Sequence, residues 1–206
     1  MKSDRWIALL RGVNVGGKNK LPMKQLVEVF QNAGCQHVKT YIQSGNVVFM
    51  AAEKVAAKMG GVVQAEIQQR WGFECKVVLR SQAELAKVLT KNPYLKNAKY
   101  GRKKSAESAE GEGASRATDE PKEMHYVMFL ADEPAAAKVE KLDPMRSPPD
   151  TFEVIGREIY LFLPNGAARS KLTNAYFDSK LGTVSTARNW RTVLTLAEMA
   201  EELGGE

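Results

Sequence analysis

Three polar stretches contain the residues best suited to bind an anion. The first lies in WIALLRGVNVGGKNK (residues 6–20), where an apolar run ends at Arg11 and a glycine-rich, basic loop follows. Glycine allows a tight turn, and consecutive free N–H groups beside ammonium groups suit a phosphate or carboxylate. The spacing matches neither the P-loop pattern nor GxGxxG. The loop is therefore predicted either to grip an anion or to be a tight connection that needs glycine.

The second stretch is YIQSGN (residues 41–46), which lies between two strand-like runs. An exposed Tyr41 on a sheet could stack on a base, as aromatic residues do in RNA-recognition modules. The glycine–aromatic run typical of those modules is missing. A purely structural turn is favoured for Ser44 and Gly45, whereas Tyr41 and Gln43 are left open.

The third stretch consists of two segments, PNGAARSK (164–171) and TARNWRT (186–192), each predicted to be a loop leading into a helix. Arginine binds carboxylates and phosphates through two parallel hydrogen bonds, so adjacent loops would form a basic surface. For Asn189 and Trp190 a helix cap and a core position are favoured instead. The full set of candidate anion-binding residues is Arg11, Asn14, Lys18, Asn19, Gln43, Asn46, Arg169, Ser170, Lys171, Arg188 and Asn189.

Composition narrows the class of protein without naming a reaction. The 206 residues carry a net charge of +6, which fits a phosphate-bearing partner but does not require one. Cys35 and Cys75 are distant in sequence, and neither a signal peptide nor a membrane-spanning run is evident, so we expect a cytoplasmic protein with reduced thiols. Two histidines and no nucleophile motif leave no metal site, cofactor or catalytic residue to predict.

Hydrophobic periodicity predicts an α+β fold with two similar halves. In the first half we expect strands at 6–10, 38–43, 47–50 and 75–79 and helices at 22–33, 53–71 and 82–90. In the second we expect strands at 125–130, 152–155, 158–163 and 183–186 and helices at 134–142, 171–181 and 191–203. Each half has the ferredoxin-like order β-α-β-β-α-β plus one helix. The predicted units are residues 1–95 and 123–206, joined by a polar, flexible linker at 96–122.

Four runs together resemble the bacterial family called domain of unknown function 1697. They are ALLRGVNVGGKNKLPM (8–23), TYIQSGNVVF (40–49), GREIYLFLPNGAARSKL (156–172) and TARNWRTVLTLAEM (186–199). The resemblance implies a duplicated ferredoxin-like fold and no established activity, substrate or catalytic residue. The family's recurrent polar positions fall on the candidate residues above, together with Ser44 and Trp190. The segment at 96–122 looks longer and more polar than is usual for the family.

Three functional hypotheses follow. The leading one is a binding module for an anionic ligand, either nucleic acid or a nucleotide. The second is an enzyme that acts on a phosphorylated or acidic small molecule in a cleft between the halves, with Arg and Lys supplying electrostatic stabilisation. The third is an interaction or oligomerisation scaffold. The sequence leaves the oligomeric state open, and it also leaves open whether the loops of the two halves converge.

Overall fold

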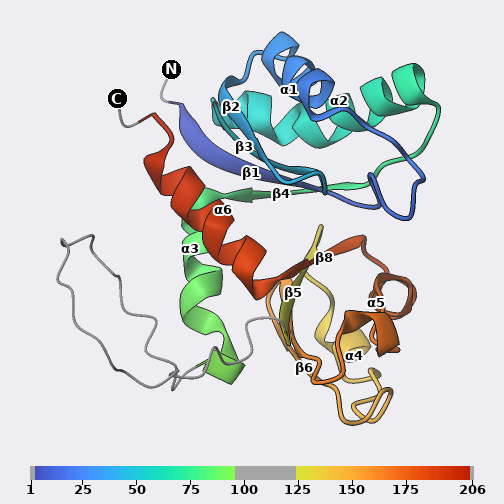
Figure 1. The fold of residues 1–206 in the computed structure, drawn as a ribbon. Coiled ribbons are helices and arrows are strands. Elements are labelled where there is room, and N and C mark those ends of the chain that lie inside the picture. Colours follow the sequence, from blue (N-terminus) through green and yellow to red (C-terminus); the bar gives the residue numbers. More distant parts are fainter. Residues whose placement is uncertain (1–2, 96–123, 205–206) are drawn as a thin grey trace, which may run out of the picture.

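The computed structural model describes residues 3–95 and 124–204, which form an α+β protein with two four-stranded antiparallel sheets and six α-helices. The first half follows the predicted order β-α-β-β-α-β with one further helix (Figure 1). Its elements are β1 (Asp4–Leu10), α1 (Met23–Asn32), β2 (Gln36–Tyr41), β3 (Asn46–Ala51), α2 (Glu53–Trp71), β4 (Val77–Ser81), α3 (Gln82–Lys91) and the short 3-10 helix η1 (Pro93–Leu95).

The second half repeats the same order of elements. They are β5 (His125–Leu130), α4 (Ala136–Val139), β6 (Thr151–Ile155), β7 (Glu158–Phe162), the 3-10 helix η2 (Ala167–Arg169), α5 (Asn174–Leu181), β8 (Ser185–Asn189) and α6 (Trp190–Glu202). The predicted linker at 96–122 lies outside the described residues.

The two sheets also share their strand order and register. The first sheet runs β2-β3-β1-β4 and the second β6-β7-β5-β8, so that the first strand of each half pairs with both the third and the fourth strand. Leu9 pairs with Asn46, the first residue of β3, and Phe129 pairs with Glu158, the first residue of β7. Positions in the two halves can therefore be matched residue by residue.

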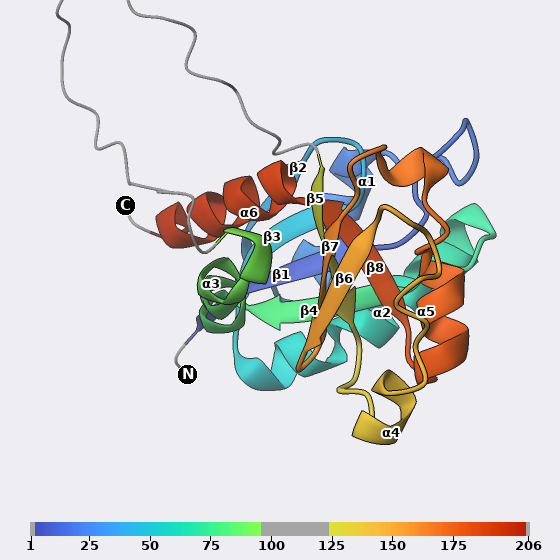
Figure 2. The ribbon, with the colours of Figure 1, turned by 90° about the horizontal axis from the view of Figure 1, so that it is seen from below.

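The sheets face each other, and their outer faces carry helices (Figures 1 and 2). On the outer face of the first sheet, α1 and α2 bury side chains such as Phe30 and Ile67 against Ala8 and Phe49. On the outer face of the second, Phe177 of α5 packs among Met128 and Leu161. Between the sheets lies a shared core with contributions from both halves, which α3 and α6 complete: Ile7, Leu9, Val48, Val78, Leu85, Val88, Val127, Phe129, Tyr160, Trp190, Val193 and Leu196.

Two helix, two strand and one turn predictions need correction. The helix expected at 134–142 covers only Ala136–Val139, and the helix expected at 171–181 begins at Asn174, because Thr173 caps it. The fourth strand of the first half begins at Val77, two residues later than expected, because Cys75 and Lys76 precede the ladder with β1. The last strand, β8, runs to Asn189 and passes directly into α6, so the segment 186–192 is strand and helix instead of a loop. The turn between β2 and β3 covers residues 42–45, and Asn46 already belongs to β3.

The helices in the described parts of the chain are too short or too polar to cross a bilayer. The longest helix, α2, has Lys and Glu side chains throughout and ends at Gly72, which adopts the left-handed conformation that glycine tolerates best. The other helices pack against the two sheets. The ends of β1 and β8 and the start of β3 contribute to the site described next.

Candidate functional site

The glycine-rich stretch after β1 forms a hydrogen-bonded finger, defined here as Gly12–Asn19. At its tip Gly16 and Gly17 both have positive φ, and the Lys18 amide donates to the Val15 carbonyl at 3.0 Å. The Asn14 side chain holds the base, since it donates to the carbonyls of Leu21 and Gln43 and accepts from the Leu21 amide at 2.8 to 2.9 Å. Asn19 donates its side-chain amide to the Gly12 carbonyl at 2.9 Å. The two predicted ligand-binding asparagines thus shape the finger.

The turn at 42–45 packs against the base of the finger. The Leu10 amide donates to the Gly45 carbonyl at 2.8 Å, and a Cβ atom at Gly45 would lie 2.6 Å from the Leu10 Cβ. Glycine is required there by both the contact and a φ of +73°. Ile42 has a φ of +48°, a conformation that a β-branched residue adopts only under strain.

A cleft of about 500 Å³ lies between the finger, the turn and the second half. Segments distant in sequence therefore meet at one cleft. Of the two second-half segments predicted to lie there, only 186–192 contributes, and it does so as strand and helix. Figure 1 shows the loop after β1 on the same side of the molecule as α5. From the first half it is lined by Leu10, Arg11, Gly12, Val13, Val15, Ile42 and Ser44, and from the second by Tyr126, Asn174, Thr186, Ala187, Arg188, Asn189 and Thr192.

Arg11, at the end of β1, bridges the two halves across this cleft. Its Nη1 donates to the Asp178 carboxylate of α5 and to the Ser185 carbonyl at 3.2 Å. The other Asp178 oxygen accepts from the Ser185 hydroxyl at 2.6 Å, and that hydroxyl accepts from Asn174 at 2.9 Å. Among the described residues these contacts use only Nη1, so Nε and Nη2 of the half-exposed Arg11 remain available to an anion.

Arg188, on β8, uses its whole guanidinium within the protein. Nε donates to the Asn46 side chain, Nη1 to Thr186 Oγ1 and the Ala187 carbonyl, and Nη2 to the carbonyls of Leu10 at 2.7 Å and Ser44 at 3.3 Å. These bonds account for its five N–H groups. Burial lowers the pKa of Arg188 to about 10, which leaves it charged at neutral pH.

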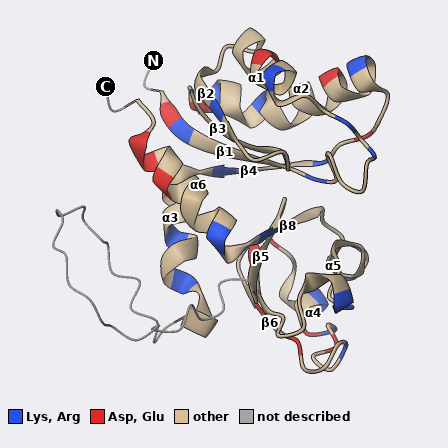
Figure 3. Ribbon diagram, in the orientation of Figure 1, with Lys and Arg blue, Asp and Glu red and all other residues tan. Residues whose placement is uncertain are grey.

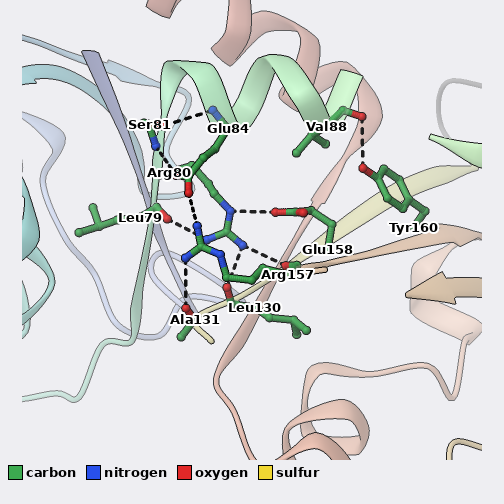
Figure 4. Close-up of polar contacts among 10 residues, drawn as sticks. All are labelled: Leu79, Arg80, Ser81, Glu84, Val88, Leu130, Ala131, Arg157, Glu158 and Tyr160. Atoms are coloured by element: carbon green, nitrogen blue, oxygen red, sulfur yellow. Dashed lines mark hydrogen bonds and ion pairs between the residues drawn. The ribbon is translucent and has the colours of Figure 1, made fainter. Parts of the chain in front are cut away.

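Arg80, on β4, makes the matching set of contacts in the opposite direction (Figure 4). Nε donates to Glu158 at 2.9 Å, Nη1 to the carbonyl of the preceding residue, Leu79, and Nη2 to the carbonyls of Leu130 and Arg157. Glu158 corresponds to Asn46 and Leu130 to Leu10, since each pair shares its place in the sheet register. Each half therefore inserts one arginine into the strand ends of the other half.

Beside Arg80, an ion pair occupies the position that corresponds to the cleft beside Arg188. Arg157, in the turn between β6 and β7, donates to Glu84 of α3 and to the Ala131 carbonyl (Figure 4). Glu84 is the third residue of α3 and completes a capping box with Ser81. The matching residue of α6 is Thr192, whose amide is capped by Asn189, and it lines the open cleft. One of two related positions is thus closed by an ion pair and the other is open.

The remaining predicted residues divide into two groups. Asn189 accepts from the Thr192 amide at 2.8 Å and Trp190 is buried, so the cap and core positions favoured for them are confirmed. Lys18 and Gln43 are exposed beside the cleft without lining it, and Figure 3 shows basic segments in the loop after β1. Arg169 ends η2 and is followed by Ser170 and Lys171, and none of the three lines the cleft.

Four residues of the cleft region lie outside the stretches that the sequence analysis singled out. Asp178, Ser185 and Asn174 form the network around Arg11, and Tyr126 contributes its ring to the lining. In the sequence, Asp178 stands out only as an isolated carboxylate on a predicted helix. Nothing near it shows that its partner is Arg11, 167 residues away. In the part of the chain that the structure describes, no three His, Cys, Asp or Glu side chains cluster as metal ligands would.

Fold and site together define an α+β protein whose two packed halves enclose a cleft open to solvent. The family whose model matches residues 3–109 is described as a protein of unknown function, DUF1697, and the chain belongs to this family. Its structure is similar to that of the conserved bacterial protein SP0830 from Streptococcus pneumoniae, with a TM-score of 0.66 and 20% identity over 97% of this chain and 99% of that one. The comparison with curated proteins found no match.

Proposed function

We propose that this protein binds a small anionic ligand in the cleft between the finger, the turn at 42–45 and β8. The observation that carries the proposal is the difference between the two related positions. Arg157 and Glu84 close one of them, whereas the other is an open cleft of about 500 Å³ beside an arginine with unused donors. An arginine with two free N–H groups on one edge of its guanidinium can bind a phosphate or carboxylate through two parallel hydrogen bonds.

The same architecture favours a small molecule over nucleic acid. In a ferredoxin-like RNA-binding module the bases stack on an exposed sheet face. Here the facing surfaces of both sheets are buried in the shared core, and the half-buried Tyr41 packs against that core. A concave site between two packed units is a common place for a small ligand.

We also infer that the two halves are ferredoxin-like units that arose by duplication. Three matched features support this inference. The halves share element order and strand order. They also share a strand register in which Asn46 corresponds to Glu158. Each half contributes one arginine, Arg80 or Arg188, that hydrogen-bonds to strand ends of the other half. Under this inference the molecule once had two equivalent clefts, and the open cleft is the one that has not been filled.

The test is a thermal-shift and native mass spectrometry screen with inorganic phosphate, nucleoside monophosphates, sugar phosphates, dicarboxylates and short oligonucleotides. A ligand present at a hundred times its Kd stabilises the native state by about 2.7 kcal/mol. We expect Arg11→Gln to abolish the shift. Arg70→Gln is the matched control, because Arg70 is similarly exposed, pairs with Glu66 on its own helix α2 and does not line the cleft.

Two results would count against the proposal. One is a ligand whose binding survives Arg11→Gln unchanged. The other is stabilisation by oligonucleotides alone with a steep dependence on salt, which is the signature of contacts to a phosphate backbone. The second result would make nucleic acid the favoured ligand.

A further inference from the structure

Two exposed apolar side chains flank the cleft, and packing explains neither of them. The described residues include four large hydrophobic side chains that are exposed, and two of the four, Val15 at 64% and Ile42 at 54%, line this cleft. Burying such a side chain stabilises a protein, so leaving it in water forgoes that stabilisation. Hydrogen bonds nevertheless fix the backbone at or beside both residues: the Lys18 amide donates to the Val15 carbonyl, and Asn14 donates to the carbonyl of Gln43, which follows Ile42.

Ile42 carries a second unfavourable feature. Its φ of +48° places a β-branched residue in the left-handed region. Asn14 and Asn19 also have positive φ, but asparagine tolerates that conformation well. A residue held under strain costs on the order of 1–3 kcal/mol and points to a functional constraint at that position. Asparagine or glycine at position 42 would relieve the strain, yet the sequence places isoleucine there.

We infer that Val15 and Ile42 form an apolar clamp for the body of the ligand, whose anionic group binds Arg11. The inference rests on the proposed function and narrows it to small organic anions with an apolar body, in preference to bare inorganic anions. The clamp and the arginine belong to one cleft, and Leu10 and Val13 add apolar surface to its lining. A cleft of about 500 Å³ accommodates a molecule of that kind.

Matched probe pairs separate the two parts of the site. Phenyl phosphate and inorganic phosphate differ by the ring, and so do benzoate and acetate. Titrations followed by ¹⁵N chemical shifts, at constant ionic strength, measure each Kd even when binding is weak. In the wild-type protein we expect the probe with the ring to bind about tenfold tighter than its partner, as removal of a ring face from water predicts. The two pairs tell whether phosphate or carboxylate is preferred.

Three variants complete the experiment. In Ile42→Asn the preference for the ring should fall below about threefold while the Kd of inorganic phosphate stays unchanged, and the melting temperature should stay or rise, because asparagine accepts the turn's φ. Arg11→Gln should weaken both members of each pair equally. Met145→Ala, which truncates an exposed apolar residue outside the cleft, should change neither.

The outcomes separate the clamp from the anion site. An Ile42→Asn protein that keeps the full preference, or a wild-type protein without any preference for the ring, overturns the clamp and leaves the anion site standing. A lower melting temperature in Ile42→Asn with an unchanged preference assigns Ile42 a structural role and likewise overturns it. If none of the four probes shifts the resonances of the finger, the clamp and the proposed function fail together.

Discussion

Arg80 and Arg188 each reach across the interface and hydrogen-bond to the other half, Arg80 from a fully buried position and Arg188 from a half-buried one. Arg80 is fully buried, and its guanidinium lies 5.5 Å from the centre of the Phe129 ring in addition to its bond with Glu158. Arg188 has no carboxylate among its hydrogen-bond partners, and its donors satisfy backbone carbonyls and the Asn46 amide. Removal of either side chain would leave several buried acceptors without donors, which is the expensive part of losing a buried hydrogen bond.

We therefore predict that Arg188→Met lowers the free energy of unfolding by about 2–4 kcal/mol, measured by urea denaturation. Arg188→Lys should recover only part of the loss, because an ammonium group has three donors and no fork geometry. Arg169→Met, at an exposed position, should change stability by less than about 0.5 kcal/mol. A loss of similar size in Arg169→Met would show that the effect is not specific to Arg188.

The two thiols are the second case at this scale. Burial raises the pKa of both Cys35 and Cys75 to about 11, and Cys75 also donates to the Arg11 carbonyl at 3.6 Å. Since only the thiolate reacts, we predict that neither residue is modified by a disulfide reagent at pH 8 until the protein is unfolded. The folded state keeps its thiol protons to higher pH than the unfolded state, so these residues make stability fall as pH rises from 9 towards 11. Fast labelling of native protein at pH 8 would contradict this.

At the scale of elements, local signals predicted much of the fold, and non-local packing decided the rest. The predictions were correct for the bounds of α2 and β5 and for the capping box at Ser81. Hydrophobic periodicity and helix caps depend on residues that are close in sequence, so the sequence alone reveals them. The end of β8 was missed because Arg188 looks like a surface residue. Nothing nearby in sequence shows that carbonyls of the other half will satisfy it.

The candidate site was predictable to the same extent. Its loops were found because glycine and charge mark them, and Arg11 was among the residues named. The partners of Arg11 were not found, since Asp178 and Ser185 reach it only once the sheets have packed face to face. Conversely Asn14 and Asn46 were grouped with the ligand-binding residues because a polar side chain in a loop looks the same whether it binds a ligand or its own backbone.

The N-terminus of α6 offers a prediction that separates capping from ligand binding. Asn189 caps the helix through the Thr192 amide and also lines the cleft. We predict that Asn189→Ala lowers stability by about 1 kcal/mol, whereas Asn189→Asp keeps the cap and its stability. The new carboxylate should weaken anion binding in the cleft at least severalfold, and salt should reduce the effect. Equal stability of the Ala and Asp variants would remove the capping role.

At the scale of the whole molecule, the shared core leads us to expect that the two halves unfold as one cooperative unit. The inner faces of both sheets bury their apolar residues only against each other and against α3 and α6. Helix α6 is the last element of the second half, yet it packs on β1 and β3 of the first as well as on β5 and β8. Either half alone would expose a broad apolar face, which a stable soluble domain rarely does.

We predict that a cavity made in the outer core of one half destabilises both halves equally. Phe177→Ala removes a fully buried ring from the outer core of the second half and should cost about 3–5 kcal/mol. Native-state hydrogen exchange should then report the same loss for the slowest amides of β1 and β3 as for those of β5 and β7, since global opening exposes them together. Phe49→Ala, in the outer core of the first half, should give the reciprocal result. If protection in β1 and β3 survived Phe177→Ala, the halves would be independent domains, and the cleft would join two bodies able to unfold separately.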